Sequence, residues 1–378
     1  MNNIKIGFIG AGHISNSMSK AIDNIEGIEK YAVSSRDINK AQKFAKEHNF
    51  KKSYGSYKEM LEDNNVELVY VATPVSYHYE HVKMSLEYGK HILCEKTFTS
   101  NYKEAKELIS ISKKNNLLLA DAIWTRYMPS RYKIDEFLNR GIIGIPKMLE
   151  ANLGYILTNK SRLFNKELSG GALYEIGIYP INLALSTLGH DIKKISVTSI
   201  IDNNGIDLQS SITISYNEDI IANLLYSINS ITDSRAVIAG TNGYIVIENI
   251  NNPQNIYVYS KERKLLDSYS KNDGIKGYEY QLKSVVKSIN NGLIECKDMT
   301  HNDIIEEMKL VDNIRKEQKR TEKNRKEQKR TEKNRKEQKR TEKNRKEQKR
   351  TYLNIILYYI LKKSQYTKNC VLTFLFLN

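Results

Sequence analysis

Residues 5–16, KIGFIGAGHISN, constrain the fold of this chain more than any other segment. A short apolar strand runs into a glycine turn, and a helical pattern begins directly after it. Gly10 permits the tight turn, and Gly12 lets the backbone come close to a pyrophosphate. Backbone amides from about His13 and Ile14 onward would then face the negative charge of the ligand. The segment therefore predicts a dinucleotide-binding turn.

The glycine pattern is incomplete, because Ser15 stands where a third glycine is expected. A glycine pair alone is weak evidence, so a glycine turn in another kind of α/β domain is the alternative. The place of the turn, between a first strand and a first helix, favours the dinucleotide interpretation.

Strands and helices alternate through the first third of the chain, which predicts a doubly wound parallel sheet with crossover helices over residues 1–121. The expected strands are 4–9, 30–35, 67–73, 91–94 and 117–121, and the expected helices are 13–24, 37–48, 56–64, 77–89 and 101–115. Asp37 and Asn101 are placed to cap two of these helices.

The pattern changes in residues 122–314, where polarity alternates along several strand-like segments. The expected strands are 147–156, 193–202, 207–216, 219–229, 233–240 and 243–248, with helices near 129–140, 172–188, 276–291 and 301–316. This pattern predicts a second domain with a mainly antiparallel sheet and few helices.

The second expected strand ends at Ser34 and Ser35 and is followed by Arg36. Folds that bind NAD place an acidic residue here for the ribose 2′-hydroxyl. Arg36 instead offers a planar guanidinium to a 2′-phosphate, and the next carboxylate, Asp37, is assigned to the helix cap. We therefore expect NADP rather than NAD. The alternative is that Arg36 is a solvated surface residue.

Polar side chains also follow the third and fourth expected strands. One strand ends at Thr73 and Pro74, with His78 in the following helix, and the other ends at Glu95 and Lys96. The carboxyl ends of parallel strands face the ligand crevice, so these are candidate cofactor-binding residues. A lysine beside a carboxylate at this edge can steer or protonate a substrate oxygen.

Several segments together, in this order, resemble the Gfo/Idh/MocA family of oxidoreductases over residues 1–318. They are IGAGHIS at the start, SSRD at 34–37, ATPVSYHYEH at 72–81, GKHILCEK at 89–96 and GGALYEIGIYPIN at 170–182. The segments AIWTRYMP at 122–129, GYEYQL at 277–282 and MTHNDIIEEMKLVDNIRKEQ at 299–318 are most similar to the dimeric dihydrodiol dehydrogenase branch. The resemblance implies a Rossmann domain and an α/β domain whose open sheet face holds substrate and often pairs two subunits.

The resemblance also carries roles over to particular residues. It places Lys96 near the nicotinamide and the reacting oxygen, makes Tyr179 the proton donor, and puts Glu175 where an aspartate is usual. We expect the Lys96 cation to bring the pKa of Tyr179 toward the working range. The implied reaction is NADP-dependent hydride transfer to or from a CH–OH carbon of a small sugar, polyol or cyclic diol.

The resemblance further implies that His78 lies near the cofactor and that Trp124 and Arg126 line the cleft. One departure is Thr97, where the family has proline after the lysine. Either Lys96 is then held less well, or the peptide bond before Thr97 is trans. The alternative function is a dinucleotide-binding sensor or scaffold that has lost catalysis.

The net charge of +15 belongs to the end of the chain. Residues 315–351, which repeat RKEQKRTEKN, hold 19 Lys and Arg against 7 Glu, and residues 352–378 add three lysines. Residues 1–314 are therefore neutral, and we expect this body to bind no nucleic acid. The repeat has no apolar residue, which predicts a disordered or solvated helical tail; the alternative is an arm that binds polyanions weakly.

Residues 352–378 contain two apolar runs of about ten residues, each too short to span a bilayer. The interpretations left open are non-native sequence after the repeat, an aggregation-prone end, and a segment that rests on a membrane surface.

The cysteines and several histidines show no pattern of a disulfide framework or a metal site, so we expect no metal and a reducing, cytoplasmic setting. They are Cys94, Cys296, Cys370, His48, His190 and His301.

Overall fold

The computed structural model describes residues 3–271 and 276–375, which fall into two compact units, Met1–Lys319 and Arg320–Asn378. The body was expected to end at residue 314. The first unit extends further because part of the first repeat copy packs within it: Gln318 is buried.

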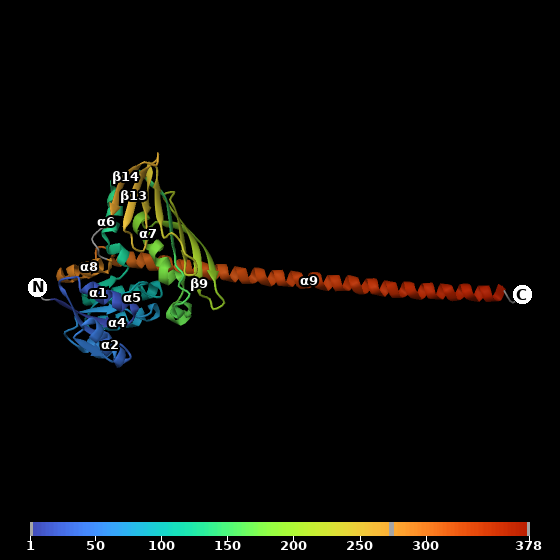
Figure 1. Ribbon diagram of the computed structural model, residues 1–378, viewed down its shortest axis with the longest axis horizontal. Helices are drawn as coiled ribbons and strands as arrows, with labels where there is room; N and C mark the ends of the chain where they lie inside the picture. Colours follow the sequence, from blue (N-terminus) through green and yellow to red (C-terminus); the bar gives the residue numbers. More distant parts are fainter. Residues whose placement is uncertain (1–2, 272–275, 376–378) are drawn as a thin grey trace. The chain divides into compact units, whose positions relative to one another are not determined.

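The first unit begins with a six-stranded parallel sheet in the order β3-β2-β1-β4-β5-β6, which confirms the predicted doubly wound sheet (Figure 1). Its strands are β1 (Ile4–Ile9), β2 (Ile28–Ser34), β3 (Lys52–Tyr54), β4 (Leu68–Val71), β5 (His91–Cys94) and β6 (Leu119–Asp121). Its helices are α1 (His13–Ile22), α2 (Ile38–His48), α3 (Tyr57–Glu62), α4 (His78–Glu87) and α5 (Tyr102–Asn115). The order of the strands reverses between β1 and β4, and ligands of such sheets bind at this point.

Local sequence explains where these helices begin. The Asp37 carboxylate accepts hydrogen bonds from the amides of Asn39 and Lys40, and the Asn101 side chain accepts one from the amide of Glu104. Both predicted caps are therefore confirmed. Strands β4 and β5 are almost continuously buried, as expected for central strands covered by helices on both faces.

The second sheet has eight strands in the order β14-β13-β12-β11-β7-β10-β9-β8. They are β7 (Pro146–Gly154), β8 (Ile192–Ile201), β9 (Asp207–Tyr216), β10 (Ile221–Ser227), β11 (Ala236–Gly240), β12 (Gly243–Ile247), β13 (Asn255–Ser260) and β14 (Leu265–Ser270). Only the β7–β10 pair is parallel, so the prediction of a mainly antiparallel sheet is correct. Strands β3, β13 and β14 are absent from the sequence analysis.

Helices α6 (Pro129–Asn139) and α7 (Ile178–Leu188) pack against the second sheet (Figure 1). Along β10, Ala222 and Leu224 are buried, whereas Ile221, Asn223 and Leu225 are exposed. This alternation means that α6 and α7 cover one face, while the described part of the first unit leaves the other face open.

The described part of the first unit closes with α8 (Tyr278–Asn290) and the start of α9 (His301–Leu375). Helix α9 continues through the repeat into the second unit, where residues 330–363 are exposed. No described helix is long and apolar enough to cross a membrane. The predictions for residues 376–378 lie outside the described residues.

Candidate active site

The candidate residues of the first domain gather where β1, β2, β4 and β5 end, because all four strands are parallel neighbours in one sheet. The turn after β1 requires glycine at position 10. Gly10 has φ +107°, and a Cβ there would lie 3.1 Å from the carbonyl oxygen of Ala72. The Ser15 hydroxyl donates a 2.8 Å hydrogen bond to the Gly10 carbonyl oxygen, so the serine in place of the third glycine stabilises this turn.

The N-terminus of helix α1 is suited to binding an anion. Gly12 is its N-cap, no side chain caps it, and the first turn, which holds the exposed His13 and the half-buried Ile14, has no acidic residue. Unpaired amides and the helix dipole then face the crevice, so these residues fit a dinucleotide pyrophosphate.

Arg36 is exposed directly after β2, with its guanidinium carbon 6.0 Å from the ring centre of Tyr77. Tyr77 in turn stacks on His81 at 5.8 Å, and His81 Nδ1 lies 3.0 Å from the Thr73 hydroxyl. Burial lowers the pKa of His81 to about 4, so this ring is neutral at pH 7. The stack of Arg36, Tyr77 and His81 thus links the ends of β2 and β4. Of these three side chains, Arg36 carries the charge.

Two other predicted cofactor residues support the backbone at these strand ends. The buried Ser35 hydroxyl accepts a hydrogen bond from the amide of Asp37. Pro74 is the N-cap of a 3-10 turn, Val75–Tyr77, that leads into α4.

His78 and Glu95 are both buried, so the structure does not expose them as direct cofactor ligands. The two ring nitrogens of His78 lie within hydrogen-bond distance of the carbonyl oxygens of Thr73, Thr97 and Phe98. Burial raises the pKa of Glu95 to about 7, and its carboxylate accepts a 2.5 Å hydrogen bond from the Tyr70 hydroxyl. His78 thus holds the loop after Lys96, and its place near the cofactor stays a prediction.

The Lys96–Thr97 peptide bond is cis, which contradicts the trans alternative. The Thr97 hydroxyl donates a 3.0 Å hydrogen bond to the carbonyl oxygen of Tyr174. A proline side chain could not make this bond. The threonine therefore connects the lysine loop to the segment that carries Glu175.

Lys96 and Glu175 meet at the centre of the site. The segment Leu173–Gly177 forms a π-helical turn before α7, and Lys96 Nζ donates a 2.6 Å hydrogen bond to the carbonyl oxygen of Glu175. The lysine nitrogen also lies 3.8 Å from Glu175 Oε2. These two residues are 79 positions apart in the sequence, and the structure brings them together as the resemblance implies.

Three cations surround the Glu175 carboxylate. Burial alone would raise its pKa, but Lys96, Arg162 and Lys160 outweigh burial and lower the pKa to about 2. Arg162 donates two hydrogen bonds to this carboxylate at 2.8 and 2.9 Å, and Lys160 lies 3.6 Å away. Glu175 is therefore ionised across the physiological range.

Tyr179 completes the site from the first turn of α7. Lys96 Nζ lies 5.3 Å from the centre of its ring, and its hydroxyl accepts a 3.1 Å hydrogen bond from Trp124 Nε1. Trp124 stacks on Tyr278 with 4.9 Å between the ring centres. Burial raises the pKa of Tyr179 well above its usual value, so the expectation that Lys96 brings this pKa down is wrong. The phenol is held protonated.

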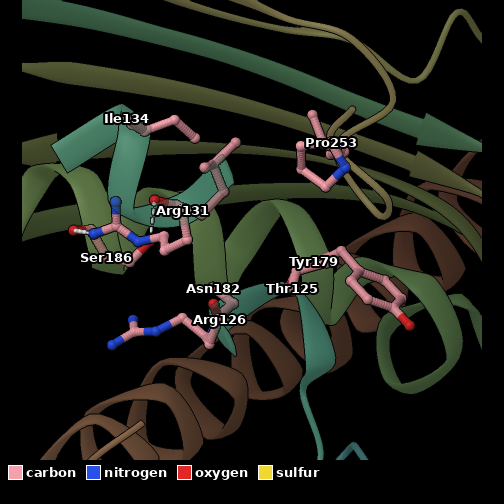
Figure 2. A pocket seen from close by; sticks show the side chains of 10 residues that line it. Thr125, Arg126, Arg131, Ile134, Tyr179, Asn182, Ser186 and Pro253 are labelled. Atoms are coloured by element: carbon pink, nitrogen blue, oxygen red, sulfur yellow. Dashed lines mark hydrogen bonds between the residues drawn. The ribbon is translucent and has the colours of Figure 1, made fainter. Parts of the chain in front are cut away.

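Arg126 is turned away from this centre. Its guanidinium pairs with Asp303 at 3.2 Å and donates to the carbonyl oxygen of Asp298, so it connects the turn at Trp124–Tyr127 to the start of α9. Figure 2 shows side chains that line a cavity beside Tyr179, whose hydroxyl points away from Arg126 and Arg131. The volume of this cavity is about 20 Å³. This volume suits about one water molecule, so the cavity is too small for a sugar or a diol.

The sequence analysis identified Lys96, Glu175 and Tyr179 as the reacting group but missed several residues that set their environment. Arg162 and Lys160 lie in a loop without periodicity, and nothing in the sequence assigns them to Glu175. Tyr278 was within a quoted segment, GYEYQL, yet its contact with Trp124 depends on the packing of α8.

Comparisons with known proteins cover both domains. The model of the oxidoreductase family GFO/IDH/MocA, with an NAD-binding Rossmann fold, matches residues 4–121. The model of the GFO/IDH/MocA C-terminal domain matches residues 132–246.

Among curated proteins, the chain is 33% identical over 264 residues to trans-1,2-dihydrobenzene-1,2-diol dehydrogenase of Xenopus tropicalis, covering 69% of this chain and 80% of the relative. It is 27% identical to scyllo-inositol 2-dehydrogenase (NADP(+)) of Bacillus subtilis, covering 83% of this chain and 96% of the relative. Among solved structures, KijD10, a 3-ketoreductase from Actinomadura kijaniata in complex with NADP and TDP-benzene, has the same fold. The TM-score is 0.77 at 21% identity, over 83% of this chain and 98% of that one.

Proposed function

This chain belongs to the Gfo/Idh/MocA family of NAD(P)-dependent oxidoreductases, and we propose that it uses NADP to interconvert a secondary alcohol and a ketone on a small cyclic diol, polyol or sugar. The observation that carries the proposal is the meeting of Lys96, Glu175 and Tyr179 beside the crevice. A protonated phenol and a lysine cation at one point suit a reaction in which a carbonyl oxygen gains negative charge and then a proton.

In the reduction direction, the Tyr179 phenol donates its proton to the carbonyl oxygen as the carbon gains a hydride. Lys96 stabilises the negative charge that develops on that oxygen, and Glu175 fixes the lysine through the contacts described above. The nicotinamide, when bound, supplies or accepts the hydride. In the oxidation direction the same oxygen returns the proton to Tyr179.

Two relatives and the side chains beside Tyr179 support the proposed substrate class. Trans-1,2-dihydrobenzene-1,2-diol and scyllo-inositol are both six-membered carbocycles with neighbouring hydroxyls. The stacked rings of Trp124 and Tyr278 lie beside the Tyr179 hydroxyl, and aromatic rings pack well on the apolar faces of such carbocycles. A cyclic 1,2-diol is therefore the first substrate to test.

The direct test is to titrate the protein with NADPH and NADH, following the fluorescence of the nicotinamide. The protein is then assayed with NADP and a panel containing the dihydrodiol, scyllo-inositol and common aldoses. Binding with turnover on one of these classes supports the proposal. Tight NADPH binding without turnover on any of them would instead support the sensor or scaffold.

Arg36→Ala is expected to weaken NADPH binding by roughly 10- to 100-fold and to leave NADH binding unchanged. A charge-assisted hydrogen bond contributes about 1.5–3 kcal/mol, and NADH lacks the 2′-phosphate that would receive it. Lys40→Ala removes one charge from an exposed site in the first turn of α2 and serves as the matched control. Equal losses for both nucleotides would show that Arg36 does not read the 2′-phosphate.

We further propose that two copies pair through the open face of the second sheet, and that the protein works in the cytoplasm, where its buried free thiols, Cys94 and Cys296, stay reduced. Four aliphatic side chains are nearly half exposed on the open face. They are Met148, Ile200, Ile221 and Leu225. In a dimer these side chains would bury apolar surface.

Leu225→Arg is expected to convert the dimer to a monomer, because it places a charge at the centre of the buried face. Light scattering coupled to size exclusion measures the mass. Leu293→Arg alters an equally exposed leucine in the loop after α8 and should leave the dimer intact. A wild-type monomer, or a dimeric Leu225→Arg protein, would contradict this proposal.

A further inference from the structure

Two side chains of α9, Arg315 and Gln318, lie in the first copy of the repeat yet reach the segments that carry Lys96, Glu175 and Tyr179. The inference below rests on the proposed function of those three residues. It concerns how they are held in place.

Arg315 bridges the lysine loop and the segment before α7. Its Nη1 donates a 3.0 Å hydrogen bond to the carbonyl oxygen of Ser100, and its guanidinium lies 5.2 Å from the centre of the Tyr174 ring. The Tyr174 hydroxyl donates to the same Ser100 oxygen at 2.7 Å. Because Thr97 also bonds to the Tyr174 carbonyl, the arginine closes a ring of contacts around the loop that begins at Lys96.

Gln318 is buried and holds the other end of the segment. Its Nε2 lies 3.4 Å from Asp207 Oδ2, and the same carboxylate oxygen accepts a 2.8 Å hydrogen bond from the amide of Leu173, the first residue of the π-helical turn. Gln318 Nε2 also lies 3.2 Å from the Ser210 hydroxyl. One amide group of α9 thus ties strand β9 to the turn that carries Glu175.

The same glutamine contacts a tyrosine that packs under the turn. Gln318 Nε2 lies 3.4 Å from the Tyr226 hydroxyl. A Cβ at Gly177 would be 2.9 Å from the Tyr226 ring, so this ring lies directly against the backbone two residues before Tyr179. Displacing Tyr226 would therefore displace the start of α7.

We infer that Arg315 and Gln318 are positioning residues of the active site: they hold the Lys96 loop and the Glu175–Tyr179 segment in register with each other. Neither is placed to touch substrate. Their effect is on geometry, and small displacements of reacting groups cost rate even when the fold is kept.

The test uses the full-length protein with Arg315→Ala and Gln318→Ala. We expect kcat to fall roughly 10- to 100-fold, with the NADPH dissociation constant unchanged. Arg315→Lys keeps a cation over Tyr174 and a donor for Ser100, so it should recover part of the rate. Trp124 is the only tryptophan in the chain, and it bonds to Tyr179. Its emission should shift to the red, and acrylamide should quench it more strongly, in both alanine variants.

The repeat supplies matched controls within the same helix. Arg335 and Gln338 occupy the same positions of a later repeat copy as Arg315 and Gln318, and the residues that follow them are the same, but both are exposed. Arg335→Ala and Gln338→Ala should keep wild-type kcat and emission. Unchanged kcat and emission in Arg315→Ala and Gln318→Ala would overturn the inference. Equal losses of rate and NADPH binding, matched by a fall in Tm, would also overturn it, because they indicate a purely structural role.

The tryptophan measurement separates this inference from the proposed function. If the wild-type protein turns over no substrate of the panel, the catalytic proposal fails. The emission of Trp124 in the four variants still decides whether Arg315 and Gln318 hold the segment.

Discussion

A Tyr179→Phe variant is expected to lose turnover by roughly 10²- to 10⁴-fold while its NADPH affinity stays almost unchanged. The substitution removes the Tyr179 hydroxyl, which burial keeps protonated, and it leaves the ring under the lysine cation in place. Steady-state turnover at saturating substrate and a fluorescence titration with NADPH measure the two quantities.

The control for this variant is Tyr127→Phe. Tyr127 is also buried, and its hydroxyl donates a 2.7 Å hydrogen bond to the carbonyl oxygen of Asp121. Its loss should reduce the free energy of unfolding by about 1 kcal/mol and leave turnover near the wild-type value. Equal turnover in Tyr179→Phe and the wild type would refute the role of Tyr179 as proton donor.

A Lys96→Met variant is expected to lower turnover by roughly 10²- to 10³-fold, the range for removing one group that stabilises a developing oxyanion. The expected effect is large because the lysine donates to the Glu175 carbonyl, lies near its carboxylate and faces Tyr179. Turnover of the carbonyl substrate with NADPH, compared with the wild type, measures the loss.

Lys160→Met separates this role from simple charge pairing. Lys160 also lies near the Glu175 carboxylate, but it is about half exposed, and among the contacts of the described residues it makes none with Tyr179. We expect its removal to change turnover little. If the two methionine variants lose the same activity, Lys96 acts only as a partner of Glu175.

Much of the fold could be predicted because local patterns and long-range packing agree in the first domain. Strands β1 and β5 were placed with their observed limits, since apolar runs of this kind end at clear turn or helix signals. Strand β3 has three residues, too few for any periodicity. Strand β14 lies at the sheet edge with most side chains exposed, so it lacks the buried face that gives alternation.

The site was predictable where motifs are contiguous and unpredictable where distant segments meet. Lys96 and Tyr179 lie in segments that match the family pattern. Arg36 follows the second strand, where an arginine in place of an acidic residue is suited to a 2′-phosphate. The state of Tyr179 depends instead on burial, which no motif encodes. Arg162 acts on the site from a short 3-10 turn and Arg315 from within helix α9, so only tertiary packing identifies them.

Because the start of the first repeat copy is part of the folded body, the contacts of the body do not depend on how many copies follow. Every full copy reads RKEQKRTEKN, so gain or loss of whole units restores arginine at position 315 and glutamine at position 318. Each ten-residue step turns an α-helix by about 1000°, so the next copy presents its own pair about 80° away around the axis. Replication slippage can therefore lengthen or shorten the array without changing the residues that hold the active site, so selection on catalysis does not act on the number of copies.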